Sequence, residues 1–363
     1  MSTSLQVNFR GLLNEITLPE YKSLWPLFEA IVNSIQSIND SVGVEKGNIQ
    51  IKATRIGQEK LKDFTNLPYN DFEIIDNGAG FTSQNYSSFL EAYSELKITK
   101  GCKGLGRFLW LKAFDRVEIE SVFYENNQYF KRFFEFNERD FIKPENNVVP
   151  TTQQNIYTKV RLIGFKNKYQ KNCSVNIEPI AKKIIEHCMM YFISNSCPQI
   201  ILSDEDEKID INDYFNSKVK DSLHRDDFEL SNHIFSIYHI QMNESASKHE
   251  LHLCASNREV ESISLSKKIP NLNTRLTDEQ GNEYYYVGYL TGDYLDSAVN
   301  TNRTAFYIDE DSNLTNTILK NDIINNSLNF IKIYLGEDLN KVKEKKKEQI
   351  DRYVRSCKPQ YKF

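Results

Sequence analysis

Apolar residues recur at two different spacings in residues 20–200 and divide this stretch into predicted helices and strands. Residues 24–38 carry an apolar side chain at every third or fourth position, which predicts a helix that begins near Leu24. Residues 174–194 show the same helical period, and residues 87–114 hold helical stretches around a glycine-rich loop. Alternating or short apolar runs predict strands at 47–56, 71–81, 115–125, 128–137 and 156–165, the last three as a meander.

A polar and acidic stretch, residues 203–218, changes the composition, and we place a domain boundary near residue 200. Beyond it, three more strand-like segments and helical segments around 312–335 predict a second domain. The charged residues 337–363 predict a helix that either protrudes or continues into a longer chain. The predicted organisation is an arm at 1–20, a first domain at 21–200, a second domain at 201–335 and a charged C-terminal helix at 336–363.

The composition is that of a soluble globular protein, with 40% hydrophobic and 26% charged residues, and a length of 363 residues favours two domains. The chain has no apolar run of about 20 residues that could span a membrane and no apolar signal core at its N-terminus. None of the six cysteines stands at zinc-ligand spacing, so we expect reduced thiols in a cytoplasmic protein. The net charge of −5 does not favour a chain that is basic throughout, although lysines cluster at 97–103 and 341–347.

The helix predicted near Leu24 has an unusual polar side. From Ser23 to Ile38 its only charged residue is Glu29, and Asn33 follows one helical turn later on the same side. A helix side that faces water normally carries several charged residues, so this side is expected to face something other than water. The alternative is a helix packed between two layers, with Glu29 paired to a lysine.

Two glycine-containing segments follow this helix. The sequence DNGAGF, residues 76–81, is either a tight turn or a site in which Asp76 accepts a hydrogen bond from the amino group of adenine, with Gly78 and Gly80 leaving room for the ring. Glycines at 101, 104 and 106 precede an apolar helix, whose first N–H groups can bind phosphate. This loop lacks the G-x-x-x-x-G-K-[ST] pattern of a Walker A loop. It is not a dinucleotide fingerprint either, because Leu109 occupies the position of the third glycine and the loop does not directly follow a strand.

Taken in order, these segments resemble the GHKL ATPase superfamily, which includes gyrase B, MutL-type repair proteins, MORC proteins, heat-shock chaperone ATPases and histidine kinases. EAIVNSIQS resembles the box with glutamate and asparagine, IIDNGAGF the adenine box, GCKGLGRF the phosphate loop, and YTKVRL the later threonine strand. The resemblance covers residues 20–200. Gln36 and Ser37 depart from the Asp and Ala of many members, and Tyr157 replaces a glycine.

The resemblance implies an α+β fold: a two-layer α/β sandwich that binds ATP, followed by a smaller α/β transducer-like domain. It implies that Asn33 coordinates Mg²⁺, that Glu29 orients or deprotonates the attacking water, and that Asp76 binds adenine with help from Thr158 through a water. Since a carboxylate stands beside the phosphate, we expect slow hydrolysis rather than transfer to a histidine. The residues implied in phosphate binding are Gly104, Leu105, Gly106 and Arg107 through their backbone, and Lys97, Lys100 or Lys103 from a lid at 84–103, where each lysine is otherwise merely solvated.

The transducer resemblance rests on LHLCASNREV, residues 251–260, and is less specific. It implies a basic sensor of the γ-phosphate, for which Arg303 in NTNRTAF is the first candidate and Lys267 and Lys268 are the second. Arg303 is otherwise a surface arginine paired with an acid. In relatives, ATP closes the lid and N-terminal arms exchange in a homodimer, a role that residues 1–20 could take.

Three functions remain open at this stage. The first is an ATP-gated clamp that acts on or near DNA, in DNA processing or antiviral defence, with a nuclease or helicase as partner. The second is a heat-shock-like chaperone, although 363 residues cannot hold its middle and C-terminal domains. The third is a module that binds ATP without hydrolysing it, against which Glu29 argues.

Overall fold

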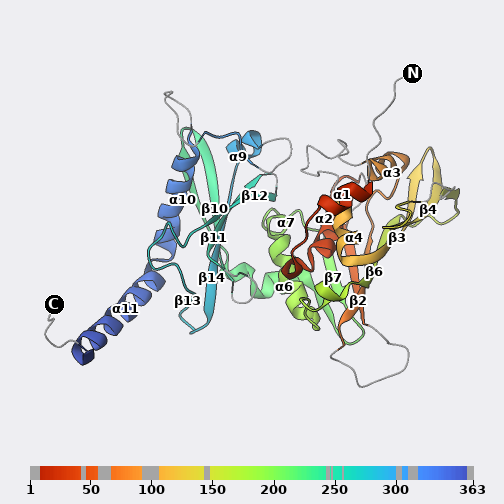
Figure 1. Cartoon of the computed structure of the whole chain (residues 1–363). Helices are drawn as coiled ribbons and strands as arrows, with labels where there is room; N and C mark the ends of the chain where they lie inside the picture. Colours follow the sequence, from red (N-terminus) through yellow and green to blue (C-terminus); the bar gives the residue numbers. More distant parts are fainter. Residues whose placement is uncertain are drawn as a thin grey trace. The chain divides into compact units, whose positions relative to one another are not determined.

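The computed structural model describes residues 9–41, 46–55, 67–91, 106–142, 148–242, 246, 248–255, 257–299, 305–309 and 318–357. The chain divides into two compact units, Met1–Phe215 and Asn216–Phe363 (Figure 1). None of the helices in these described ranges is long and apolar enough to cross a membrane.

Unit 1 is built on a mixed sheet of eight strands in the order β5-β4-β3-β6-β2-β1-β7-β8. All neighbouring strands are antiparallel except β1 and β7, which run parallel. The hairpin between β3 and β4 turns through Asn126 and Asn127, whose positive φ angles of 50° and 60° suit a two-residue turn. The strands are β1 (Asn48–Arg55), β2 (Tyr69–Asp76), β3 (Phe114–Glu125), β4 (Gln128–Asn137), β5 (Val148–Pro150), β6 (Tyr157–Phe165), β7 (Gln199–Ser203) and β8 (Lys208–Asp210).

Helices cover one face of this sheet. Helix α2 (Trp25–Asn39) packs on β1 and β2, α4 (Gly106–Ala113) packs on β3 and against α2, and α6 (Ile177–His187) packs on β7 and β8. The other face carries a charged network in which Arg161 pairs with Glu118 and Glu73. The sheet thus has one face covered by helices and one charged face, which is the two-layer α+β architecture that was predicted. The remaining elements of the unit are α1 (Phe9–Glu15), η1 (Glu20–Lys22), α3 (Ser83–Leu90), α5 (Asn167–Gln170), α7 (Met189–Ile193) and the start of α8 (Ile211–Lys218).

The predicted meander is wrong in its strand order. Strand β6 pairs with β3 rather than with β4, so β3 lies between its hairpin partner and β6. This order places β6 beside β2 as well, and it is the β2–β6 pair that positions the candidate site. The helix predicted at 174–194 is divided in two at Cys188, where α6 ends and α7 begins.

The boundary between the units lies beyond the predicted residue 200. The acidic stretch forms the β7–β8 hairpin, which extends the first sheet, and the units divide at Phe215. Asp204 explains why an acidic segment belongs to the fold: its Oδ2 lies 3.0 Å from Nη2 of Arg55 and accepts a hydrogen bond of 2.7 Å from the Tyr69 hydroxyl. Burial alone would raise the pKa of Asp204, but the Tyr69 hydrogen bond and the Arg55 charge lower it below its ordinary value.

The described part of the predicted N-terminal arm packs on its own unit. Leu13 and Leu18 are buried, and the Tyr169 hydroxyl donates a hydrogen bond of 3.1 Å to the carbonyl oxygen of Leu18. Residues 9–20 are therefore part of the first core rather than a free extension.

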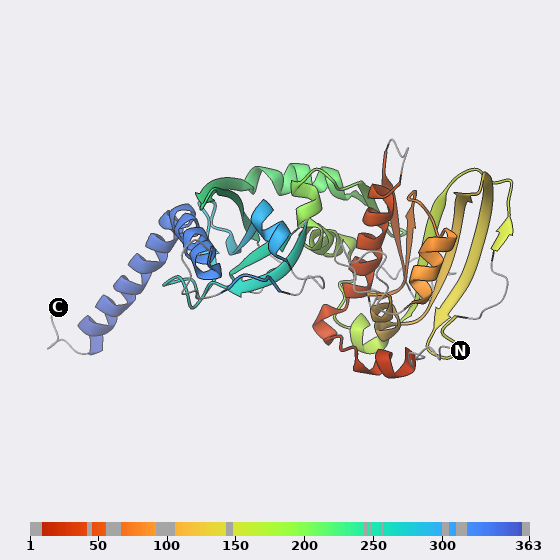
Figure 2. The ribbon, with the colours of Figure 1, turned by 90° about the horizontal axis from the view of Figure 1, so that it is seen from above.

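Unit 2 contains a six-stranded sheet in the order β12-β11-β14-β10-β9, with β13 paired to β14. Helices α9 and α10 pack on this sheet, and α11 begins against α10 and β13 and then runs out beyond the sheet (Figures 1 and 2). Its elements are η3 (Lys220–Ser222), β9 (His224–Leu230), β10 (His233–Met242), β11 (Glu250–Ala255), β12 (Arg258–Ser264), β13 (Leu276–Thr277), β14 (Glu283–Gly292), α9 (Asp293–Ala298), α10 (Lys320–Tyr334) and α11 (Gly336–Cys357).

Candidate functional site

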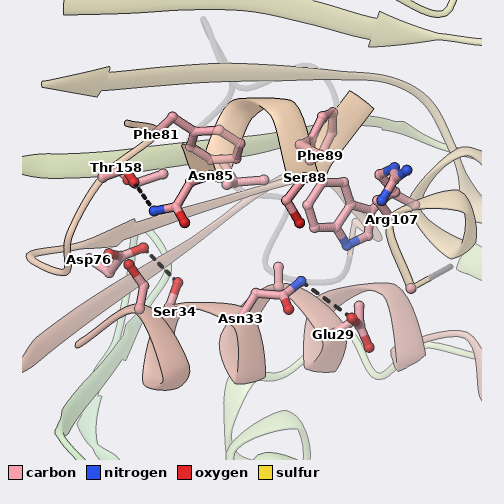
Figure 3. A pocket seen from close by; sticks show the side chains of 16 residues that line it. Glu29, Asn33, Ser34, Asp76, Phe81, Asn85, Ser88, Phe89, Arg107 and Thr158 are labelled. Carbon is pink, nitrogen blue, oxygen red and sulfur yellow. Dashed lines mark hydrogen bonds between the residues drawn. The ribbon is translucent and has the colours of Figure 1, made fainter. Parts of the chain in front are cut away.

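A cavity of about 150 Å³ opens in unit 1 between helices α2, α3 and α4 and the strands β2 and β6 (Figure 3). Its lining brings together the glutamate, the asparagine, the aspartate and the threonine that the sequence placed in three separate motifs. The lining residues are Glu29, Ala30, Asn33, Ser34, Ser37, Asp76, Gly80, Phe81, Asn85, Ser88, Phe89, Gly106, Arg107, Trp110, Thr158 and Val160.

Asp76 is the last residue of β2 and lies at one end of this cavity, where it is only 4% exposed. Its Oδ2 accepts a hydrogen bond of 2.8 Å from the Ser34 hydroxyl, and its Oδ1 accepts one of 2.9 Å from the Gly78 backbone. These two bonds hold the carboxylate in a fixed orientation. The arrangement presents a fixed, buried acceptor to whatever enters the cavity.

Thr158 is brought to Asp76 by the register of the sheet. The two residues are direct partners in the antiparallel β2–β6 pair, although 82 positions of sequence separate them. Ser121 on the next strand bonds Thr158 through the two hydroxyl groups at 3.1 Å and accepts from the Phe81 backbone at 2.9 Å. Ser121 was not predicted, since nothing in a single strand reveals which residue will stand beside it.

Tyr157, the departure from the glycine of the family pattern, points away from this arrangement. Its hydroxyl donates to Glu120, which belongs to the charged network of the opposite face. Burial and this hydrogen bond raise the pKa of Tyr157 to about 12. Neighbouring strand residues face opposite sides of a sheet, so a bulky residue at 157 leaves the cavity unchanged.

Glu29 and Asn33 lie at the other end of the cavity, on successive turns of α2. The Asn33 amide nitrogen donates a hydrogen bond of 3.3 Å to Oε1 of Glu29 (Figure 3). This bond uses the Nδ2 side of the amide, and Oδ1 is a hard oxygen of the kind that Mg²⁺ takes. The first residue of α4, Gly106, is so close that a Cβ built on it would lie 1.9 Å from the same carboxylate oxygen. A side chain at position 106 would therefore displace the Glu29 carboxylate from its present place.

Arg107 contributes a buried positive charge beside this end. Its Nη2 donates a hydrogen bond of 2.9 Å to the carbonyl oxygen of Glu91, and its guanidinium lies over the rings of Phe89 and Phe108. Burial lowers the pKa of Arg107 to about 10, and the charge of Glu29 opposes that shift. The side chain thus stays charged at neutral pH. The prediction assigned Arg107 through its backbone alone, and the structure adds the guanidinium.

Helix α3 forms a wall of the cavity that the motifs did not predict residue by residue. Asn85, Ser88 and Phe89 stand three and four positions apart and so share one face of the helix. The Thr82 hydroxyl caps the helix by accepting from the Asn85 backbone at 3.3 Å, and the Asn85 amide nitrogen donates to the Gly80 carbonyl at 2.7 Å. The spacing of Asn85, Ser88 and Phe89 falls within the predicted lid at 84–103, of which the structure describes residues 84–91.

The two glycines of the aspartate motif are small for different structural reasons. Gly78 does not line the cavity. A Cβ at this position would lie 2.3 Å from the Ser37 hydroxyl oxygen, so the close packing of the turn on α2 favours glycine there. Gly80 does line the cavity and has a positive φ of 77°, which favours glycine. The structure thus gives Gly78 a packing role against α2 and places Gly80 in the cavity lining, and the prediction that both glycines make room for a ring stays a prediction.

Several predicted residues lie outside the described ranges. These are Lys97, Lys100, Lys103, Gly104, Leu105 and Arg303. The second-choice sensors, Lys267 and Lys268, are exposed in unit 2 between β12 and β13.

No protein-family model and no curated protein matches this sequence. Among solved structures, the chain is similar to the N-terminal domain of a DNA repair protein, with 15% identity, a TM-score of 0.49, and coverage of 92% of this chain and 97% of that chain. It is also similar to the ATPase region of Saccharomyces cerevisiae topoisomerase II bound to dexrazoxane, with 12% identity, a TM-score of 0.41, and coverage of 74% and 73%. Both TM-scores are under 0.5, so neither likeness carries a functional argument.

Proposed function

We propose that unit 1 binds ATP with Mg²⁺ and hydrolyses it, as a GHKL-type ATPase. One observation carries the proposal: Asp76, Thr158, Asn33, Glu29 and Gly106, which come from four separate elements, all line a single cavity. A core residue set gathered by packing alone would be mostly apolar, whereas this set is polar and includes two carboxylates.

The Asp76 end suits an adenine base. Its carboxylate is an acceptor held in place by Ser34 and Gly78, and the exocyclic amino group of adenine is a donor. Phe81, Val160 and Ala30 supply the apolar lining that a flat ring needs. Guanine carries a carbonyl acceptor in place of that amino group, which would face a carboxylate, so the site favours adenine.

The Glu29 end suits the phosphates. From Ser37 to Glu29 helix α2 advances about 12 Å along its axis, which leaves room for a base at one end and a phosphate chain at the other. Asn33 would hold Mg²⁺ through Oδ1, and the ion would supply neutralisation of the phosphate charge. Glu29, one turn further, would orient or deprotonate the attacking water, and the start of α4 offers backbone N–H groups to phosphate oxygens.

The wider role we propose is an ATP-gated switch or homodimer clamp in the cytoplasm. It would serve DNA processing or antiviral defence with a nuclease or helicase as partner. The order of the four motifs in the sequence supports this role. In it, Arg303 would sense the γ-phosphate, and Lys97, Lys100 or Lys103 would close over the phosphates. Duplex DNA that changes ATP turnover several-fold would support the clamp, and stimulation by an unfolded protein instead would favour the chaperone role.

The ATP affinity of the Asp76→Asn variant tests whether Asp76 binds the adenine base. The amide that replaces the carboxylate presents one acceptor in place of two, and loss of a hydrogen bond to a charged group lowers affinity about tenfold to a hundredfold. Calorimetric titration with ATP gives the affinities, and Asp71→Asn, on the same strand but outside the cavity, is the control. An unchanged ATP affinity in Asp76→Asn would contradict the adenine site.

A further inference from the structure

Trp110 brings to this cavity a buried hydrogen-bond donor without a partner. Its side chain lines the cavity and is 3% exposed. Its indole Nε1 is one of the few buried side-chain nitrogens in the described residues that make no hydrogen bond. An indole N–H can only donate, so it needs an acceptor. A buried donor without an acceptor is disfavoured and calls for a specific explanation.

The position of Trp110 along α4 places it at the Glu29 end of the cavity. Gly106, Arg107 and Trp110 are spaced so that they share one side of the helix, and all three line the cavity. Gly106 abuts the Glu29 carboxylate, and Arg107 adds a buried positive charge. The unsatisfied donor therefore lies at the end of the cavity that holds the Glu29 carboxylate and the Arg107 guanidinium.

The ring is held in place by aromatic packing. The Trp110 and Phe89 rings have centroids 6.2 Å apart at 31°, and Phe89 in turn contacts Phe134 at 5.3 Å and Phe136 at 5.6 Å. The Trp110 side chain is almost fully buried and packs on Phe89, so its indole has little freedom to turn toward another acceptor. The acceptor has to come to the indole.

We propose that the Trp110 indole N–H donates a hydrogen bond to a phosphate oxygen of the bound nucleotide, which makes it a binding residue for the phosphate chain. This inference rests on the proposed ATP site. An anionic oxygen is the acceptor that an N–H prefers, and such charge-assisted bonds are the stronger ones. Arg107 beside it would reinforce the preference for a negatively charged ligand.

The test replaces the indole N–H by sulfur and keeps the two fused rings. Incorporation of 3-benzothienylalanine at position 110 does this, and the same residue at Trp25, the only other tryptophan, is the matched control. Trp25 is 39% exposed and does not line the cavity. Affinities for adenosine, ADP and ATP are measured for the wild type and both replacements, with thermal melting to confirm folding.

We expect the replacement at 110 to weaken ATP and ADP binding about tenfold to a hundredfold and to change adenosine binding less than twofold. In a Trp25→Phe background, the emission of Trp110 should shift with ATP and not with adenosine. Equal losses for adenosine and ATP, or no loss for either, would overturn the indole assignment while leaving the ATP site intact. If the wild type binds none of the three ligands, the proposed function itself fails, and this inference fails with it.

Discussion

Both units bury polar side chains, but those of unit 2 pack against one another, whereas several of those in unit 1 line a cavity. In unit 2, the His239 ring is fully buried, with Nδ1 2.7 Å from the Tyr286 hydroxyl and Nε2 3.2 Å from Oδ2 of Asp226. It also stacks on Tyr334 with ring centroids 4.5 Å apart. In unit 1, Asp76, Asn33, Glu29 and Trp110 surround an opening instead of filling it.

This difference separates structural from functional polar groups. A buried cluster whose members bond one another stabilises and specifies the fold, and removing one member leaves its partner unsatisfied. Polar groups that line an opening have bonding capacity directed at a ligand. Inside unit 1 as well, Arg55, Tyr69 and Asp204 bond one another, whereas the cavity residues line an opening. Substitutions in closed clusters should change stability, and substitutions in the cavity should change ligand chemistry.

Glu29→Gln should have the largest effect of these substitutions, and the effect should be on the rate of ATP hydrolysis. The amide cannot accept a proton from water, so we expect ATP turnover to fall by about 10²- to 10⁴-fold while ATP binding and melting temperature stay nearly unchanged. Steady-state phosphate release measures ATP turnover, and calorimetric titration measures ATP binding. Glu20→Gln, an exposed residue outside the cavity, makes the same change in charge and should behave as the wild type. Undiminished turnover in Glu29→Gln would remove this residue from the reaction.

Asp204→Ala should destabilise unit 1 by about 3–5 kcal/mol, because it leaves the Arg55 charge buried without its partner. The two side chains are only 5% and 3% exposed. Both tryptophans lie in unit 1, so urea unfolding followed by tryptophan emission reports the free energy of unfolding of this unit. Asp206→Ala, two positions along and exposed, is the control. A loss as small as that of the control would show that the pair does not anchor the β7–β8 hairpin.

Tyr286→Phe should cost unit 2 about 1–3 kcal/mol, because it removes the hydroxyl that partners His239 and leaves the ring in place. Hydrogen exchange of the β10 and β14 amides measures the local free energy of opening. Tyr285→Phe, the partly exposed neighbour on the other face of the strand, should have little effect. ATP affinity should be unchanged in both, and a clear loss of ATP binding in Tyr286→Phe would break the comparison between the units.

Mild acid should destabilise unit 2 before unit 1. Burial lowers the pKa of His239 to about 4 from its ordinary 6.5, with Asp226 opposing and His224 adding to the shift. Between these two values the unfolded chain binds more protons than the folded unit, so stability falls as the pH is lowered from 6.5 to 4. The contribution of Asp204, whose pKa is lowered below 3.8, is lost only at still lower pH. Hydrogen exchange at pH 7, 5.5 and 4.5 should show loosening of β10, and His239→Gln should weaken this pH dependence.

Much of the secondary structure was predictable from local patterns. The apolar spacing from Leu24 onward predicted α2, and α2 begins at Trp25. The alternation in residues 47–56 and 71–81 predicted β1 and β2. Glu29 and Asn33 could be paired from sequence because a helix fixes which residues are neighbours on its surface. The polar side of α2, with Glu29 as its one charged residue, lines the cavity, and the ligand expected there stays a prediction.

Contacts between elements were not predictable in the same way. The pairing of Asp76 with Thr158 depends on the β2–β6 register, and the place of Asp204 depends on a hairpin joining the sheet at β1. The close approach of Gly78 to the backbone of α2 and the place of Trp110 in the cavity lining both depend on how helices pack in unit 1. The sequence alone determined which residue types carry the chemistry and on which local faces they stand, because helical and strand periods are set by the backbone. Only the tertiary structure decided that these faces meet around one cavity, because strand order and helix packing depend on burial summed over the whole unit.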